Sequence, residues 1–66
     1  MLVSVNGKRE DVPEGLTLTE FITQKKVDAG TVIVEYNGVL VKQEEWPGIV
    51  LKENDRLEIL RFVGGG

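Results

Sequence analysis

Short segments in which apolar and polar residues alternate predict β-strands in several parts of the chain. Asn-Gly occurs twice between such segments, at Asn6-Gly7 and Asn37-Gly38. This dipeptide favours a tight hairpin turn because both central residues need a positive φ. The pattern therefore predicts two antiparallel hairpins. Their four strands are residues 2–6, 8–12, 32–36 and 39–42.

One helix is predicted between the hairpins, over residues 18–26. Thr17 and Glu20 fit a capping box, in which each side chain accepts a hydrogen bond from a free backbone amide of the other residue. We expect Lys25 and Lys26 to lie in the last turn, where positive charge complements the helix dipole. Apolar residues at i, i+3 and i+4 share one face of this helix: Leu18, Phe21 and Ile22.

The last third of the chain predicts an irregular connection, a turn and a final strand. The connection is residues 43–50, which Pro47-Gly48 interrupts. We expect Trp46 to close one end of the core and its indole N–H to find a surface acceptor. Residues 52–55 are a predicted turn, and residues 57–63 are the predicted final strand.

The order of these elements predicts an α+β fold, with a single-layer sheet and one main helix packed across one face. Residues 1–63 are expected to form the domain, and residues 64–66 a flexible C-terminal glycine tail. The residues expected in the core are Val3, Val5, Leu18, Phe21, Ile22, Leu57 and Ile59.

Composition excludes several classes of function for this 66-residue chain. It has no cysteine and no histidine, so thiolate and imidazole catalysis and the common transition-metal ligands are absent. We therefore expect neither an independent enzyme nor a metal site. The net charge of −3 disfavours binding to nucleic acid. No signal peptide or membrane span is visible, so we expect a cytoplasmic protein without a membrane partner.

Two apolar side chains of the last strand are predicted to lie on the face away from the helix, because side chains alternate along a strand. They are Leu60 and Phe62, and Leu40 is expected to join them from its own strand. Together with Val63 they are candidates for a partner-binding surface. The alternative is that they are scattered apolar residues, which protein surfaces commonly show.

The chain ends in Gly64-Gly65-Gly66, directly after the predicted last strand. Three extended residues reach about 10 Å. Without Cβ atoms, Gly64 and Gly65 could thread a channel that is too narrow for other side chains. Such a tail suits a protein whose own terminal carboxylate, on Gly66, is the reacting group. The alternative is an inert flexible end.

The sequence resembles the ThiS family of sulfur carriers, which have the ubiquitin-like β-grasp fold. The resemblance covers the whole chain. It departs from the common family pattern at Lys42-Gln43, where many members have Pro-Arg, and at Asn54, where many have glycine. The segments that carry it are Val5-Asn6-Gly7, Gly15-Leu16-Thr17-Leu18, Glu35-Tyr36-Asn37-Gly38, Glu44-Glu45-Trp46, the stretch from Leu51 through Asp55-Arg56-Leu57-Glu58-Ile59, and Phe62-Val63-Gly64-Gly65-Gly66.

This resemblance implies a mixed sheet in which the last strand lies parallel to the first, in the centre. It also implies a carrier function in thiamine biosynthesis. A ThiF-type enzyme would use ATP and magnesium to adenylate the Gly66 carboxylate. A sulfur donor, such as one fed by a cysteine desulfurase, would convert it to a thiocarboxylate, and a ThiG-type thiazole synthase would take the sulfur. The chain itself would bind no cofactor.

The free chain is expected to be a monomer. Three other interpretations stay open from the sequence. One is a sulfur carrier like the small subunit of molybdopterin synthase. Another is a ubiquitin-like modifier that is joined to lysines through Gly66. The third is a binding module whose tail is inert.

Overall fold

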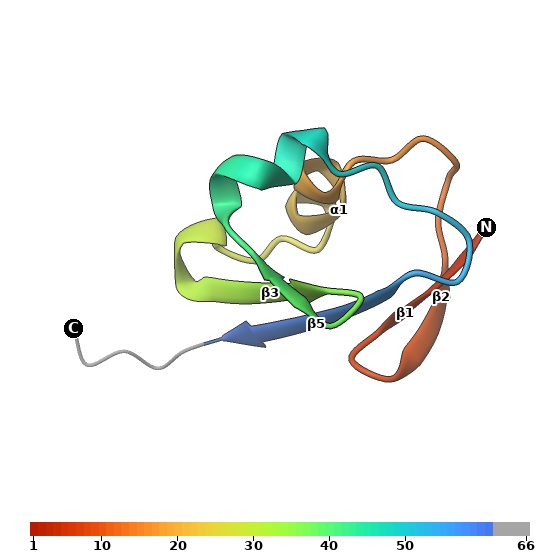
Figure 1. The fold of residues 1–66 in the computed structure, drawn as a ribbon, viewed down its shortest axis with the longest axis horizontal. Helices are drawn as coiled ribbons and strands as arrows, with labels where there is room; N and C mark the ends of the chain where they lie inside the picture. Colours follow the sequence, from red (N-terminus) through yellow and green to blue (C-terminus); the bar gives the residue numbers. More distant parts are fainter. Residues whose placement is uncertain (62–66) are drawn as a thin grey trace.

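The computed structural model describes residues 1–61, which form one five-stranded sheet with a helical layer on one face (Figure 1). The helical layer contains the α-helix α1, Leu18–Gln24, and the short 3₁₀ helix η2, Gln43–Gly48. A second 3₁₀ turn, η1, covers Ala29–Thr31. The strands are β1 Leu2–Val5, β2 Lys8–Asp11, β3 Val32–Tyr36, β4 Val39–Val41 and β5 Arg56–Arg61.

The strands lie in the order β2-β1-β5-β3-β4, so the last strand is the central one. β1 pairs antiparallel with β2, and β3 pairs antiparallel with both β4 and β5. β5 pairs parallel with β1, with Ser4 opposite Arg56 and Val5 opposite Leu57. The sheet is therefore mixed. This confirms the predicted fold class and the parallel, central position of the last strand.

Helix α1 begins as predicted but ends two residues early. The amide of Glu20 donates to Thr17 Oγ1 over 3.1 Å, and the amide of Thr17 donates to Glu20 Oε1 over 2.9 Å, which completes the capping box. The prediction that Lys25 and Lys26 lie in the last turn is wrong. Lys25 is the C-cap and forms an ion pair with Glu10 of β2, and Lys26 has a φ of 59°. This left-handed conformation stops the helical hydrogen bonding and turns the chain toward β3.

The core lies between the sheet and the helical layer. Six of the seven predicted core residues are buried. Ile59 is only partly buried, because it lies beyond the last residue of β1 and so has a neighbouring strand on one side only. Buried residues outside that predicted set are Val12, Leu16, Val32, Val34, Trp46, Leu51 and Asp55.

Trp46 closes one end of the core, as predicted. The connection that contains it is more regular than expected, because residues 43–48 form the helix η2. The indole is 3% exposed, and its N–H donates to the backbone oxygen of Val41 over 3.4 Å. Within residues 1–61, no helix has the length and apolar character needed to cross a membrane.

Candidate functional site

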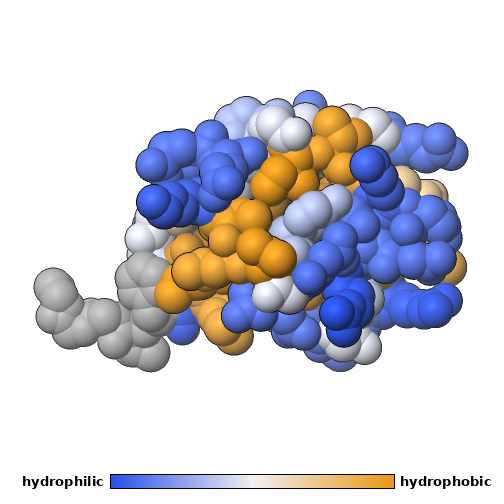
Figure 2. Space-filling model, viewed as in Figure 1, coloured by the Kyte–Doolittle hydropathy of each residue, from blue (hydrophilic) through white to orange (hydrophobic). Residues whose placement is uncertain are grey.

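The strand that leads toward the C-terminus carries an exposed apolar patch on the face of the sheet away from α1. On β5, Leu57 faces the core and is 1% exposed, whereas Leu60 is 53% exposed. Leu60 lies opposite Ile33 of β3, and Leu40 of β4 is a diagonal neighbour of Ile33 on the same face. We name Ile33, Leu40 and Leu60 the outer apolar patch. Figure 2 shows apolar surface that reaches the end of β5.

The structure brings together two residues that the sequence predicted for this surface, Leu40 and Leu60. Ile33 was not predicted, although its position between the inward-facing Val32 and Val34 places it on the same face by simple alternation. The other predicted site residues are Phe62, Val63, Gly64, Gly65 and Gly66, and all five lie outside the described residues.

Two acidic side chains border the outer apolar patch. Glu35 of β3 lies directly opposite Glu58 of β5, and both share the outer face. Like charges at opposite positions repel each other, so this pair costs stability in the free domain. A partner that brings a basic side chain to this border would relieve the repulsion. The patch therefore favours a partner surface with an apolar centre and a basic edge.

The two turn asparagines hold β5 from both sides, a role that the sequence analysis did not assign to them. Ile59 donates its amide to Asn6 Oδ1 over 2.7 Å, and its carbonyl accepts from Asn6 Nδ2 over 3.2 Å. The Asn6 side chain thus continues the β1 ladder where the strand itself has ended. At the other end of β5, the amide of Arg56 donates to Asn37 Oδ1 over 2.8 Å.

Asp55 anchors the start of β5 through a buried carboxylate. Its oxygens accept hydrogen bonds from the Tyr36 hydroxyl at 2.7 Å, the Lys52 amide at 2.8 Å and Asn37 Nδ2 at 3.1 Å. Burial alone would raise the pKa of Asp55, but these hydrogen bonds outweigh it and hold the pKa below its ordinary value. Burial, and then the contact with Asp55, raises the pKa of Tyr36 to about 12. The network therefore holds a charged Asp55 and a neutral Tyr36 at neutral pH.

The described residues present an exposed apolar surface on the strand that leads toward the C-terminus. A hollow of about 320 Å³ opens beside the outer apolar patch, lined by residues that include Ile33, Leu40 and Trp46. Over residues 1–61, the acidic side chains form no cluster of three that could hold a metal ion. This part of the chain presents the end of β5 on a sheet beside an apolar surface.

Comparisons with known proteins assign this arrangement to a family. The model of the ThiS family matches residues 2–66. The crystal structure of the thiamine biosynthesis protein ThiS from Geobacter metallireducens superposes with a TM-score of 0.88 at 39% identity and covers 100% of both chains.

Two relatives of known sequence differ in how much of their length the chain spans. The uncharacterized protein ycf40 of Trieres chinensis is 26% identical over 94% of this chain and 85% of its own length. A thiazole synthase of Paramagnetospirillum magneticum is 29% identical over 100% of this chain, which spans only 20% of that enzyme. From the family match and the shared fold, the chain belongs to the ThiS family of small, non-catalytic sulfur carrier proteins of thiamine biosynthesis.

Proposed function

We propose that this chain carries sulfur as a thiocarboxylate on Gly66. A carboxylate is a poor electrophile. In the proposed first step, the Gly66 carboxylate attacks the α-phosphate of ATP in a ThiF-type adenylating enzyme and releases pyrophosphate. A donor persulfide, such as one supplied by a cysteine desulfurase, then displaces AMP and forms an acyl disulfide. A second thiol reduces this acyl disulfide, which releases the thiocarboxylate and leaves a disulfide between the two donor sulfurs. ATP and magnesium belong to the partner enzyme, and this chain supplies only the reacting carboxylate.

The observation that carries this proposal is that the family match runs through residue 66 and so includes the terminal glycines. Gly64 and Gly65 are proposed to act as a spacer that fits a narrow channel of the partner enzyme, because glycine has no side chain. The reacting carboxylate must lie in line with the α-phosphate, so reach and orientation control the rate of adenylation.

Delivery to a thiazole synthase of the ThiG type is the proposed last step. The thiocarboxylate sulfur is a strong nucleophile, and the thiazole ring requires one sulfur atom. The thiazole synthase from Paramagnetospirillum magneticum contains a region that matches this whole chain. In that protein the two parts belong to one polypeptide, which supports a close working association between this carrier and a separate thiazole synthase.

The outer apolar patch is proposed to dock on these enzymes, with Phe62 and Val63 extending it toward the tail. Leu60 and Leu40 are more than half exposed, at 53% and 61%, so both can be covered by a partner without unfolding the domain. Burial of such side chains contributes about 25 cal/mol for each Å² removed from water.

The test is ATP–pyrophosphate exchange with the adenylating enzyme, combined with intact-mass detection of one oxygen replaced by sulfur. Deletion of Gly66 shortens the reach by about 3.5 Å and should abolish both signals. Gly65→Val should also abolish them, by blocking the channel, yet it should still bind the enzyme. Full exchange and full thiocarboxylate in the Gly66 deletion would end the carrier proposal.

A further inference from the structure

The outer face of the sheet also holds two arginines in one row, on the side away from the outer apolar patch. Ser4 of β1 lies opposite Arg9 of β2 and, on its other side, opposite Arg56 of β5. The neighbours of Ser4 along β1 are the buried Val3 and Val5, so this row projects away from the core. Two strand spacings place the Cα atoms of Arg9 and Arg56 about 10 Å apart.

A hollow of about 480 Å³ lies over this row. Gly7 borders it without a side chain, and nothing lies within 4 Å of the place where its Cβ would be. Both charges on the lining are positive, and the lining contains no carboxylate. The residues that line the hollow are Leu2, Val3, Ser4, Gly7, Arg9, Asn54 and Arg56.

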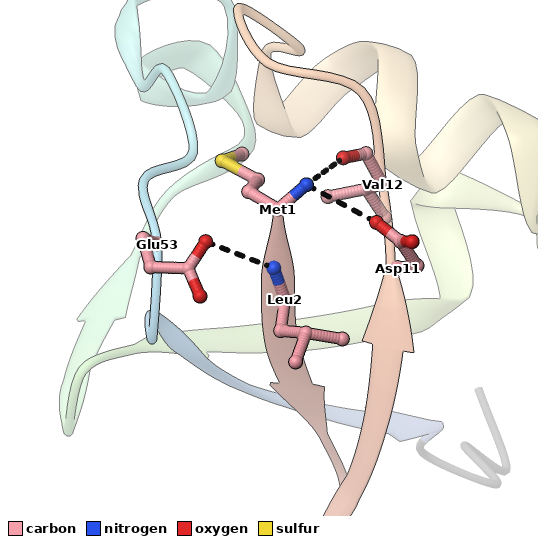
Figure 3. Close-up of polar contacts among 5 residues, drawn as sticks. All are labelled: Met1, Leu2, Asp11, Val12 and Glu53. Atoms are coloured by element: carbon pink, nitrogen blue, oxygen red, sulfur yellow. Dashed lines mark hydrogen bonds and ion pairs between the residues drawn. The ribbon is translucent and has the colours of Figure 1, made fainter.

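Three carboxylates near the hollow accept hydrogen bonds from groups other than the arginines, and two of them are drawn in Figure 3. Asp11 accepts from the Met1 ammonium at 3.1 Å, and Glu53 accepts from the Leu2 amide at 3.1 Å. Asp55 is buried and has three donors of its own. These contacts fasten the start of β1 and the turn before β5, and none of the three carboxylates forms an ion pair with Arg9 or Arg56.

Neither arginine forms an ion pair within the described part of the chain, where the ion pairs join Met1 to Asp11 and Lys25 to Glu10. Glu58 shares the outer face two residues after Arg56 but lies beyond ion-pair distance. In a chain with a net charge of −3, two neighbouring arginines are thus left with full donor capacity. The half-buried Ser4 adds a hydroxyl that makes no hydrogen bond within residues 1–61.

We propose that the hollow between Arg9 and Arg56 receives a carboxylate side chain of the protein partner that covers the outer apolar patch. This inference rests on the proposed function, because it adds a second anchor to the same docking face. A guanidinium can hold a carboxylate through two parallel hydrogen bonds, and the hydroxyl of Ser4 can donate a further one.

The distances on the sheet suit one partner for both anchors. Arg56 and Leu60 share a face four residues apart on β5, which is about 13 Å. A typical partner surface covers about 800 Å² on each side, or a disc about 30 Å across. Along the outer face of β5, Glu58 lies between Arg56 and Leu60, and Glu35 lies opposite Glu58. The partner therefore needs an acid over the hollow and a base over the neighbouring acidic pair, and this order of charges fixes its orientation.

The test compares two double variants of the full chain that change the net charge equally. Arg9→Gln with Arg56→Gln empties the hollow of charge. Lys8→Gln with Lys26→Gln is the matched control, because Lys8 pairs with the inward-facing Val5 and Lys26 follows α1. Binding of each variant to the adenylating enzyme and to the thiazole synthase is measured between about 50 and about 300 mM salt.

The arginine variant should lose about 10-fold or more in affinity for at least one enzyme and show a weaker salt dependence, whereas the lysine variant should change by less than about 3-fold. Equal losses of affinity in both variants would show that only the net charge matters, and this result would overturn the inference. So would unchanged binding by the arginine variant to both enzymes, or tight binding of inorganic phosphate in the hollow with unchanged enzyme affinity. If the unaltered chain binds neither enzyme, the proposed function itself fails.

Discussion

The Tyr36–Asp55 contact shows how one buried charge is made tolerable in a small core. Asp55 is 7% exposed, and its three hydrogen-bond donors replace the water that it loses on burial. The sequence places Asp55 in a turn but carries no sign that the turn is buried. The burial of Asp55 depends on Tyr36 and Asn37, which belong to the β3–β4 hairpin and contact Asp55 only in the folded chain.

The titration of Tyr36 tests this contact directly, because the chain contains one tyrosine. Tyrosinate absorbance should rise with a midpoint near pH 12 rather than near 10, since burial and the charge of Asp55 both disfavour the anion. Because the pKa of Tyr36 is raised on folding, the protonated tyrosine adds to the stability of the fold. This contribution is complete below the ordinary pKa of 10 and is lost as the pH rises through about 12.

Asp55→Asn is the comparison variant. It removes the charge and keeps the size of the side chain, so the tyrosine midpoint should fall but stay above 10 because burial persists. The contribution of Asp55 to stability depends on pH in the opposite direction. Because the pKa of Asp55 is lowered, this contribution is complete above the ordinary value of 3.8 and is lost as the pH falls below that value. A midpoint that is equal in both proteins would show that the charge of Asp55 does not reach Tyr36.

Strand β5 depends on side chains of two turns as well as on its neighbouring strands. Asn6 and Asn37 have φ values of 51° and 52°, which suits the predicted hairpin turns. Their amides also bind the backbone of β5 near its two ends. Glycine keeps the same turn geometry without strain, so replacement by glycine removes these hydrogen bonds and little else.

We therefore expect Asn6→Gly to lower the free energy of unfolding by roughly 1–2 kcal/mol through the loss of two hydrogen bonds. The informative measurement is hydrogen exchange of single amides by NMR. Asn6→Gly should speed exchange at Ile59, and Asn37→Gly should speed it at Arg56, each with a smaller effect on the other position. An Ile59 amide that exchanges equally slowly in Asn6→Gly would contradict the proposed role of the Asn6 side chain in holding β5.

Sequence patterns identified elements whose signals are local. The Asn-Gly turns and the capping box each lie within a few residues, and both were correctly predicted. The end of α1 was not, because a left-handed Lys26 has no signature in the sequence. Leu16 and Leu51 were missed as core residues because they lie in segments that look like loops. The Leu51 amide donates to the Leu16 carbonyl over 2.9 Å, so these two segments pair, and both side chains lie in the core.

The features of the candidate site also differ in whether a local sequence pattern could predict them. The exposure of Leu40 and Leu60 follows from alternation within single strands. The hollow between Arg9 and Arg56 depends on the parallel register of β1 and β5, which joins residues about fifty positions apart in the chain. No short-range pattern encodes that register, and the hollow is therefore visible only in the folded molecule.

The two faces of the sheet separate the core from the surface that is proposed to dock, since the inner face is buried and the outer face is open. Phe21 of α1 is 1% exposed against the inner face, whereas Leu60 is 53% exposed on the outer face. At 0.05–0.15 kcal/mol per residue, a domain of this length has a stability of roughly 3–10 kcal/mol. A single large cavity on the inner face can therefore remove most of it.

Phe21→Ala and Leu60→Ser test this separation as a pair. Phe21→Ala should cost about 3–5 kcal/mol through lost burial and a cavity that the small core cannot close. Leu60→Ser should shift the unfolding midpoint little, because its side chain is already largely in water, yet it should weaken binding to the adenylating enzyme. Thermal unfolding by circular dichroism and a binding titration of both variants measure the two effects. An unfolding midpoint for Phe21→Ala near that of the unaltered chain would refute the packing described here, and unchanged binding by a folded Leu60→Ser would remove the outer apolar patch from the docking face.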